Sequence, residues 1–168
     1  MIWFKHIYWP EPDRWGVLGL PITQSGNFVL RNYNRGDPVL LALVRKPSSR
    51  NSGHICWVCS LLSRPGATSK IINPDIPQFE YENWPEAIAI DELWEVEEPL
   101  DYKDVADGKL GEYVRPQQGR FFPIKDGKDE LVSWLNNVKL KKMDVVRSKD
   151  VQDYLDCLES AREGSYVA

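Results

Sequence analysis

Apolar residues along the chain fall into short runs separated by turn-forming residues, and this pattern predicts several short strands. The strongest run, VLLALV at residues 39–44, follows the turn Arg35-Gly36-Asp37-Pro38 and precedes a polar loop at residues 46–53. A continuous apolar run of this length predicts a strand that is buried on both faces. Residues 54–62 predict a second strand, so the two segments indicate a hairpin with a long loop.

Weaker patterns predict the remaining elements. Further extended segments are expected at residues 2–8, 15–20, 27–34, 87–90, 93–96 and 120–124, and a short helix or turn at residues 102–108. Residues 65–82 have no clear period, which predicts a long loop of the kind that often carries function. Helical spacing at residues 126–140, with Asp126 or Asp129 as the cap, and again at residues 148–162 predicts two helices. This inventory indicates an α+β domain built as a small barrel.

Composition and length favour one globular domain. The chain has 168 residues, of which 42% are hydrophobic and 11% aromatic, so it can form a full core and is not disordered. No apolar run approaches the roughly 18 residues that a membrane span needs, so no membrane is expected as a partner. The first residues lack a secretory pattern and the cysteine count is odd, which favours a reducing compartment. We therefore expect a cytoplasmic protein, or a nuclear one if it is eukaryotic.

Charge is segregated along the chain although the formal net charge is only −4. Residues 31–72 carry a net +6 and residues 108–149 a net +5, whereas residues 73–107 carry −11. Two basic segments can form a local positive face on an acidic protein, which suits nucleic acid. The alternative is that all of these charges are simply solvated, because the order along the chain does not bring the basic segments together.

Few residues suggest catalytic or metal chemistry. Cys56 and Cys59 have the C-x-x-C spacing, but both lie in a predicted strand, where this spacing points them to opposite faces. We therefore expect buried structural cysteines. No nucleophile–base arrangement and no phosphate-binding glycine loop is present. The sequence predicts a protein that is not an enzyme and that holds no cofactor or metal.

Aromatic and polar residues in predicted loops are the better candidates for binding. Trp15 precedes a glycine, and Phe79, Tyr81 and Trp84 lie at the end of the long loop. Such rings can stack on a base that has left its helix, or enclose a methylated group. The alternative is that they pack beneath their own loop. Beside Gly119, Arg115 and Arg120 suit phosphate and Gln118 suits a base edge, and Lys46 and Arg50 in the polar loop are further phosphate candidates.

The order of several short motifs resembles the PUA-like superfamily, especially its YTH and EVE branches. Residues 52–65, SGHICWVCSLLSRP, resemble the strand with which that domain's hairpin returns, and WPEAIAI at residues 84–90 resembles the next strand. EEPLDYKD at residues 97–104 resembles the segment that follows it. QGRFFPI at residues 118–124 resembles the closing motif, and DRWGV at residues 13–17 is similar to a segment of the EVE branch. Two positions depart from the pattern: Trp57 replaces a glycine of the returning strand, and Leu18 replaces a tryptophan found in YTH members.

This resemblance implies a small β-barrel flanked by helices over residues 1–145, followed by an amphipathic helix and tail at residues 146–168. It also implies an aromatic pocket for a modified base, with Trp15 in its first segment and rings from Phe79, Tyr81 or Trp84. Arg115 and Arg120 match the family's basic positions. The implied function is a reader that flips a modified, methylated base of DNA or RNA into the pocket, with DNA slightly favoured. Related domains recognise targets in modification-dependent restriction and defence systems.

Two other functions stay open at this stage. The acidic segment 73–107 is a candidate docking surface of a protein-interaction module, and the C-terminal helix is a candidate contact for a partner protein. An enzyme similar to amidohydrolase-like PUA-fold families would need a lysine or glutamate lodged in the pocket. The spacing of residues nominates no such group.

Overall fold

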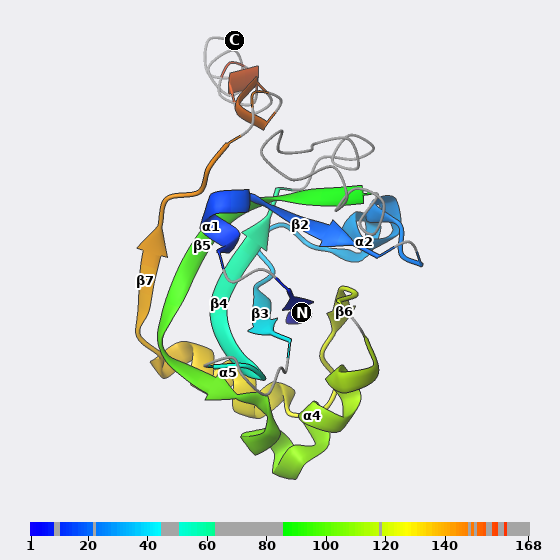
Figure 1. Ribbon diagram of the computed structural model, residues 1–168, viewed down its shortest axis with the longest axis vertical. Helices are drawn as coiled ribbons and strands as arrows, with labels where there is room; N and C mark the ends of the chain where they lie inside the picture. Colours follow the sequence, from blue (N-terminus) through cyan, green and yellow to red (C-terminus); the bar gives the residue numbers. More distant parts are fainter. Residues whose placement is uncertain are drawn as a thin grey trace, which may run out of the picture.

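A computed structural model describes residues 1–8, 11–21, 23–44, 51–62, 86–117, 119–147, 149, 151–153, 156, 157 and 160. These residues form a mixed α+β fold in which a strongly curled sheet makes a half-barrel with helices around it (Figure 1). This architecture is compatible with the small barrel flanked by helices that the sequence predicts.

The sheet is built from seven strands in the order β2-β5-β4-β3-β1-β6, with β7 added to β5. Their bounds are β1 Trp3–Ile7, β2 Val17–Leu20, β3 Val39–Leu43, β4 His54–Leu61, β5 Glu86–Asp101, β6 Phe122–Pro123 and β7 Leu140–Met143. β1 and β3 pair in parallel, and the other pairs are antiparallel. The long strand β5 has β4 along one edge and β2, then β7, along the other.

Helices flank this sheet. In the described ranges, the α-helices are α1 Pro12–Trp15, α2 Gly26–Asn32, α4 Lys109–Val114 and α5 Lys128–Asn137, and the 3₁₀ segments are η2 Tyr102–Gly108 and η3 Arg115–Gln117. The described residues between 149 and 160 are helical as well, as the spacing of residues 148–162 predicts. Among the described residues, no helix is long and apolar enough to cross a membrane.

The two larger of three hydrophobic clusters among the described residues lie on the two faces of the sheet. The first, the α2-side core, takes residues from every strand from β1 to β5, together with Val29 and Tyr33 of the α2 region and Phe121. Because strands far apart in the sheet order share this one core, the sheet must curl around it. The second, the α5-side core, lies between the sheet and η2, α4 and α5. Strand β3 supplies Val39 and Leu41 to the first core and Leu40 and Ala42 to the second. This confirms a strand buried on both faces.

Three expectations about local structure are wrong. Residues 27–34 are not extended, because Gly26–Asn32 forms α2, which turns Val29 and, one residue beyond its end, Tyr33 into the core at the helical spacing of four. The helix α5 is preceded by Gly127 at a φ of 77°, not by Asp126 or Asp129. A β-carbon at Gly127 would lie 2.7 Å from Cγ1 of Val105, so this close approach needs a glycine.

The third correction concerns the cysteine pair. Both cysteines are free and buried, as predicted. They do not lie on opposite faces, however, because Cys56 and Cys59 both belong to the α2-side core. In the pairing with β3, Leu41 faces Trp57 and Ala42 faces Ile55, so Cys56 is an extra residue that breaks the alternation of β4.

Beyond β7 the chain returns across α1 and the bend of β5. The backbone N–H of Val146 donates to the carbonyl of Asp13 at 2.9 Å, and the Arg147 guanidinium donates to the carbonyls of Ile90 and Asp91. Val151 is buried with residues of β2 and β5. The segment just past residue 145 is therefore attached to the domain, and the division into residues 1–145 and 146–168 stays a prediction.

Candidate nucleic-acid interface

A side chain bridges the two ends of the curled sheet. In the described part of the chain, β2 and β6 share no strand pairing. Gln24, in the segment between β2 and α2, donates from Nε2 to the Phe121 carbonyl at 2.7 Å and accepts at Oε1 from the Phe121 N–H at 2.8 Å. A glutamine amide offers the same donor and acceptor as a peptide group. Gln24 therefore replaces a strand partner at this junction, which we call the seam.

Lys5 of β1 reaches the same segment from within the α2-side core. Its side-chain amine donates to the carbonyl of Gly119 and lies 5.1 Å from the centre of the Phe121 ring. Lys5 is only 3% exposed, and Gly119 and Phe121 are buried too. The carbonyl and the ring face are both suited to a buried ammonium. Residues 119–121 are thus held at both ends, by Lys5 at Gly119 and by Gln24 at Phe121.

Burial changes the acidity of the groups around Lys5. Loss of hydration lowers the pKa of Lys5 to about 7, and the nearby Cys59 thiol opposes that change. The same burial raises the pKa of Cys59, whereas Lys5 lowers it. The α2-side core therefore holds an amine that is partly neutral near physiological pH.

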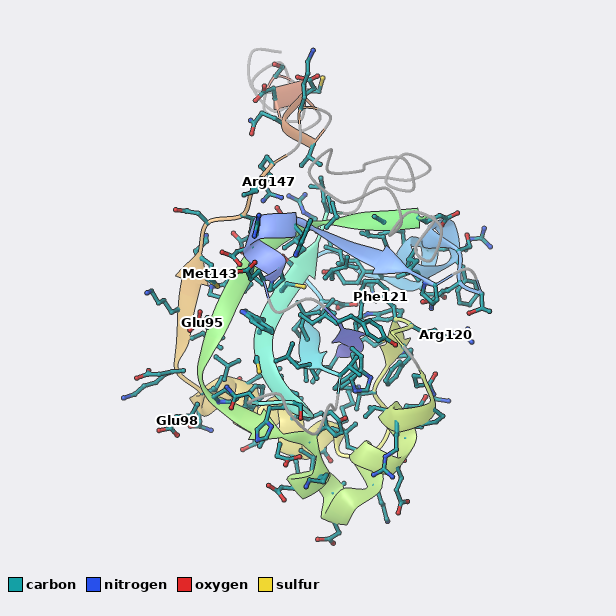
Figure 2. All side chains as sticks on the ribbon, in the orientation of Figure 1. Glu95, Glu98, Arg120, Phe121, Met143 and Arg147 are labelled. Carbon is teal, nitrogen blue, oxygen red and sulfur yellow. The ribbon has the colours of Figure 1, made fainter. Side chains whose placement is uncertain are left out.

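Arg120 lies between the two anchored residues and points outward. Its side chain is exposed, and its backbone N–H donates to the Gln117 carbonyl at 3.0 Å, closing the turn. Gly119 adopts a φ of 79°, a conformation that a glycine accepts readily. Figure 2 shows Arg120 and Phe121 side by side at the edge of the half-barrel. Arg115, at the end of α4, is exposed at the start of the same segment.

Trp15 lies at the opposite end of β2 from the seam. It is the last residue of α1, is half-buried, and has the Arg14 guanidinium 5.7 Å from its ring centre. Strand β2 begins two residues later and Gln24 follows that strand. Four strand residues span roughly 13 Å. Arg115 and Arg120 therefore lie close together in the sequence, and strand β2 separates Trp15 from Gln24 at the seam.

The other predicted binding residues lie outside the described residues. These are the rings Phe79, Tyr81 and Trp84, the amide Gln118, and the basic residues Lys46 and Arg50. The long loop predicted at residues 65–82 lies outside them as well. The assignment of these residues to a base pocket or to phosphate stays a prediction.

Sequence reasoning missed Lys5 and Gln24, and only Lys5 left a signal. In β1, Trp3, Lys5 and Ile7 alternate with Phe4 and His6, so a lysine interrupts a face that is otherwise apolar. A single charge at strand period within an apolar segment can mark a buried charge. Gln24 lies in a polar stretch, and nothing in that stretch predicts its contact with Phe121, which is 97 positions away.

A cluster of buried rings on the other face of β1 is core and not an open cage. Phe4 contacts His6, Tyr102 and Phe122 with ring centres 5.1–5.8 Å apart. Nε2 of His6 lies 3.2 Å from the Tyr102 hydroxyl oxygen. Burial, assisted by the charge of Lys5, lowers the pKa of His6 to about 4, so this imidazole is neutral at physiological pH.

An acidic groove lies away from the seam, between the outer part of β5 and α5. Its volume is about 540 Å³, and its lining includes Glu97, Glu98, Glu130, Trp134 and Lys139. Glu130 accepts a hydrogen bond from the Ala106 N–H at 3.0 Å. Glu97 and Glu98 belong to the acidic segment 73–107. Figure 2 shows Glu98 and Arg120 on opposite sides of the molecule.

Comparisons of the chain with protein-family models, with curated proteins and with solved structures found no match. Within the described ranges, no three His, Cys, Asp or Glu side chains are grouped as metal ligands. Two parts of the α+β half-barrel are therefore candidates for function, the segment at the seam and the acidic groove.

Proposed function

We propose that the protein is a nucleic-acid-binding reader that recognises a modified, methylated base, with DNA slightly favoured over RNA. The observation that carries this proposal is the pair of exposed arginines, Arg115 in η3 and Arg120 between the two residues that are anchored at the seam of the half-barrel. The resemblance of residues 13–140 to YTH and EVE domains adds to it. In such a reader the protein is a target-recognition part of a modification-dependent restriction or defence system, and it catalyses no reaction.

In the proposed mechanism, different residues contact the phosphate backbone and recognise the modified base. Arg115 and Arg120 contact phosphates, which positions the strand but carries no sequence information. The target base leaves its stack and enters a pocket lined by Trp15 and by Phe79, Tyr81 or Trp84, with Gln118 at its edge. Stacking contributes about 1–3 kcal/mol per base and offsets the cost of flipping. Lys46 and Arg50 extend the phosphate contacts.

A binding panel tests the proposal. Fluorescence anisotropy would compare methylated, hydroxymethylated and plain oligonucleotides, each as DNA and as RNA, over a range of salt concentrations. Arg115→Ala and Arg120→Ala should weaken binding to all strands and each reduce the salt slope by about one. Lys128→Ala removes an exposed cation of α5, away from the seam, and should change neither value.

Trp15→Ala should instead remove the preference for the modified strand while binding to plain strands persists. Circular dichroism and thermal melting would show whether this variant keeps its fold. If no strand binds the wild-type protein more tightly than about 1 μM at low salt, the reader proposal is wrong.

The alternative function is a protein-interaction module that docks through the acidic segment 73–107. The acidic groove favours it, because three glutamates and the Trp134 ring line one concavity. Such a surface suits a basic peptide, whose cations can contact both carboxylates and a ring face. A fluorescent peptide rich in Lys and Arg would be titrated against the wild-type protein and a Glu97→Gln/Glu98→Gln variant. Equal affinity for both proteins would exclude the groove as the docking site.

A further inference from the structure

We infer that Gln24 and Lys5 are positioning residues for the nucleic-acid contact of Arg120, an inference that rests on the proposed function. Neither side chain is available to a ligand, because Lys5 is 3% and Gln24 9% exposed. Both act on the backbone on either side of Arg120. Their contribution to binding therefore passes through that arginine.

The geometry of the anchors explains why both are needed. The Gly119 carbonyl is held by the Lys5 amine from β1, and the Phe121 peptide is held on its N–H and its carbonyl by Gln24. The Arg120 N–H itself bonds to Gln117 at 3.0 Å. The backbone of residues 119–121 is thus held by hydrogen bonds to three different residues, Lys5, Gln117 and Gln24. Arg120 is the one residue of the three whose side chain is exposed.

These side-chain contacts matter more at the seam than they would in a paired strand, because in the described part of the chain no strand pairing holds residues 119–121 in place. Among the described residues from 115 to 124, Phe122 and Pro123 are the two held by regular strand pairing, through β1. Residues 119–121 precede that pairing, so the Lys5 and Gln24 side chains position them together with the hydrogen bond from Arg120 to Gln117. When an arginine on a flexible segment binds a phosphate, the segment loses conformational entropy. If the backbone is already fixed before binding, this entropic cost is smaller. We expect Gln24→Ala to weaken oligonucleotide binding about fivefold through this route.

A double-mutant cycle tests the inference. The affinity and salt slope of the best-bound oligonucleotide of the panel would be measured for wild type, Gln24→Ala, Arg120→Ala and the double variant. Positioning predicts that the double variant binds no more weakly than Arg120→Ala alone, and that Gln24→Ala loses part of the salt slope assigned to Arg120. Hydrogen exchange at the Phe121 amide should accelerate in Gln24→Ala without any ligand, because that amide donates to Gln24.

Tyr33→Phe is the control for general destabilisation, since Tyr33 makes two hydrogen bonds in the same core with the backbone of Asp37 and Leu61. It should lower stability and leave the salt slope unchanged. Where Gln24→Ala does not fold, Lys5→Met removes the other anchor and takes its place in the cycle. Additive losses in the cycle, or binding by Gln24→Ala that equals wild type once the folded fraction is counted, overturn the inference alone. A wild-type protein that binds no oligonucleotide overturns the proposed function itself.

Discussion

Replacement of Lys5 by methionine should change how the stability of the protein depends on pH. The Lys5 side chain is 3% exposed, and burial lowers its pKa from 10.5 to about 7. Between these two pH values the unfolded chain binds a proton at Lys5 and the folded chain does not. Stability therefore rises with pH in this window, and the cost of burying the amine is fully present below about pH 7. Methionine has a similar length and no titrating group, so it removes this dependence.

The expected size follows from the width of the window. One group with this difference in proton binding changes the free energy of unfolding by about 1.4 kcal/mol per pH unit. Between about pH 7.5 and 9.5 the wild type should therefore gain roughly 2–3 kcal/mol relative to Lys5→Met. The difference between the two proteins should be flat below about pH 6.5, where Lys5 is protonated in both states.

Other groups affect the absolute curves more than the difference between them. Burial raises the pKa of Cys56 from 9.0 to about 11, so this thiol makes the protein less stable as pH rises through that range. Burial raises the pKa of Cys59 as well. Both thiols are present in wild type and variant, so subtracting the two curves removes most of their effect.

Urea denaturation followed by tryptophan fluorescence at a series of pH values measures both curves. Parallel curves for wild type and Lys5→Met between about pH 7.5 and 9.5 would refute the reasoning, because they would show an amine that keeps its ordinary pKa. The pH dependence distinguishes this cause from a packing defect. A packing defect would displace the whole curve by a constant amount.

Two further predictions concern stability. Gly16→Ala should lower the free energy of unfolding by well over about 1–2 kcal/mol, because Gly16 has a φ of 69° and a β-carbon there would lie 2.1 Å from the Val146 carbonyl oxygen. The control Gly36→Ala, at a φ of 88° with nothing within 4 Å, should lower it by only about 1–2 kcal/mol. Equal losses for the two variants in urea denaturation would contradict the close contact at Gly16. Tyr33→Phe should cost about 1–3 kcal/mol, because its hydroxyl donates to the Asp37 carbonyl at 2.6 Å and accepts from the Leu61 N–H at 2.9 Å. Tyr113→Phe, whose hydroxyl makes no hydrogen bond with described residues, should change stability by less than about 0.5 kcal/mol in the same assay.

Local pattern predicted most of the strands because their signal is carried by adjacent residues, but it did not predict β7 at Leu140–Met143. The run at residues 39–44 became β3, and the two segments within residues 87–96 became parts of the single strand β5. Helix α2 was missed because few apolar residues mark its buried side, chiefly Val29 and Tyr33 with the partly buried Leu30, and so short a pattern does not distinguish a helix from a strand. The bulge at Cys56 adds a residue without any local signal, so both cysteines lie on one face where opposite faces were expected.

The contacts that form the seam could not be predicted from local sequence pattern, because they join residues far apart in the sequence. Lys5 bonds to a residue 114 positions away, and Gln24 to one 97 positions away. The parallel pairing of β1 with β3 brings Lys5 into the sheet, and parallel pairing requires a crossover that no single segment encodes. The residues that local reasoning could nominate were exposed polar and aromatic ones. Arg115 and Arg120 are of that kind and are exposed, and their assignment to phosphate stays a prediction.

The separation of the two charged surfaces bears on how a polyanion could bind a protein whose net charge is −4. At physiological salt, charges further apart than about 8 Å are largely screened from each other. Arg120 and Glu98 lie on opposite sides of the molecule (Figure 2). A short oligonucleotide bound at the seam would therefore be attracted by the charges of the arginines and repelled little by the glutamates of the groove. Neutralising Glu97 and Glu98 should therefore leave oligonucleotide affinity unchanged. The charge of the whole chain then predicts neither function, because each depends on the face that meets the partner.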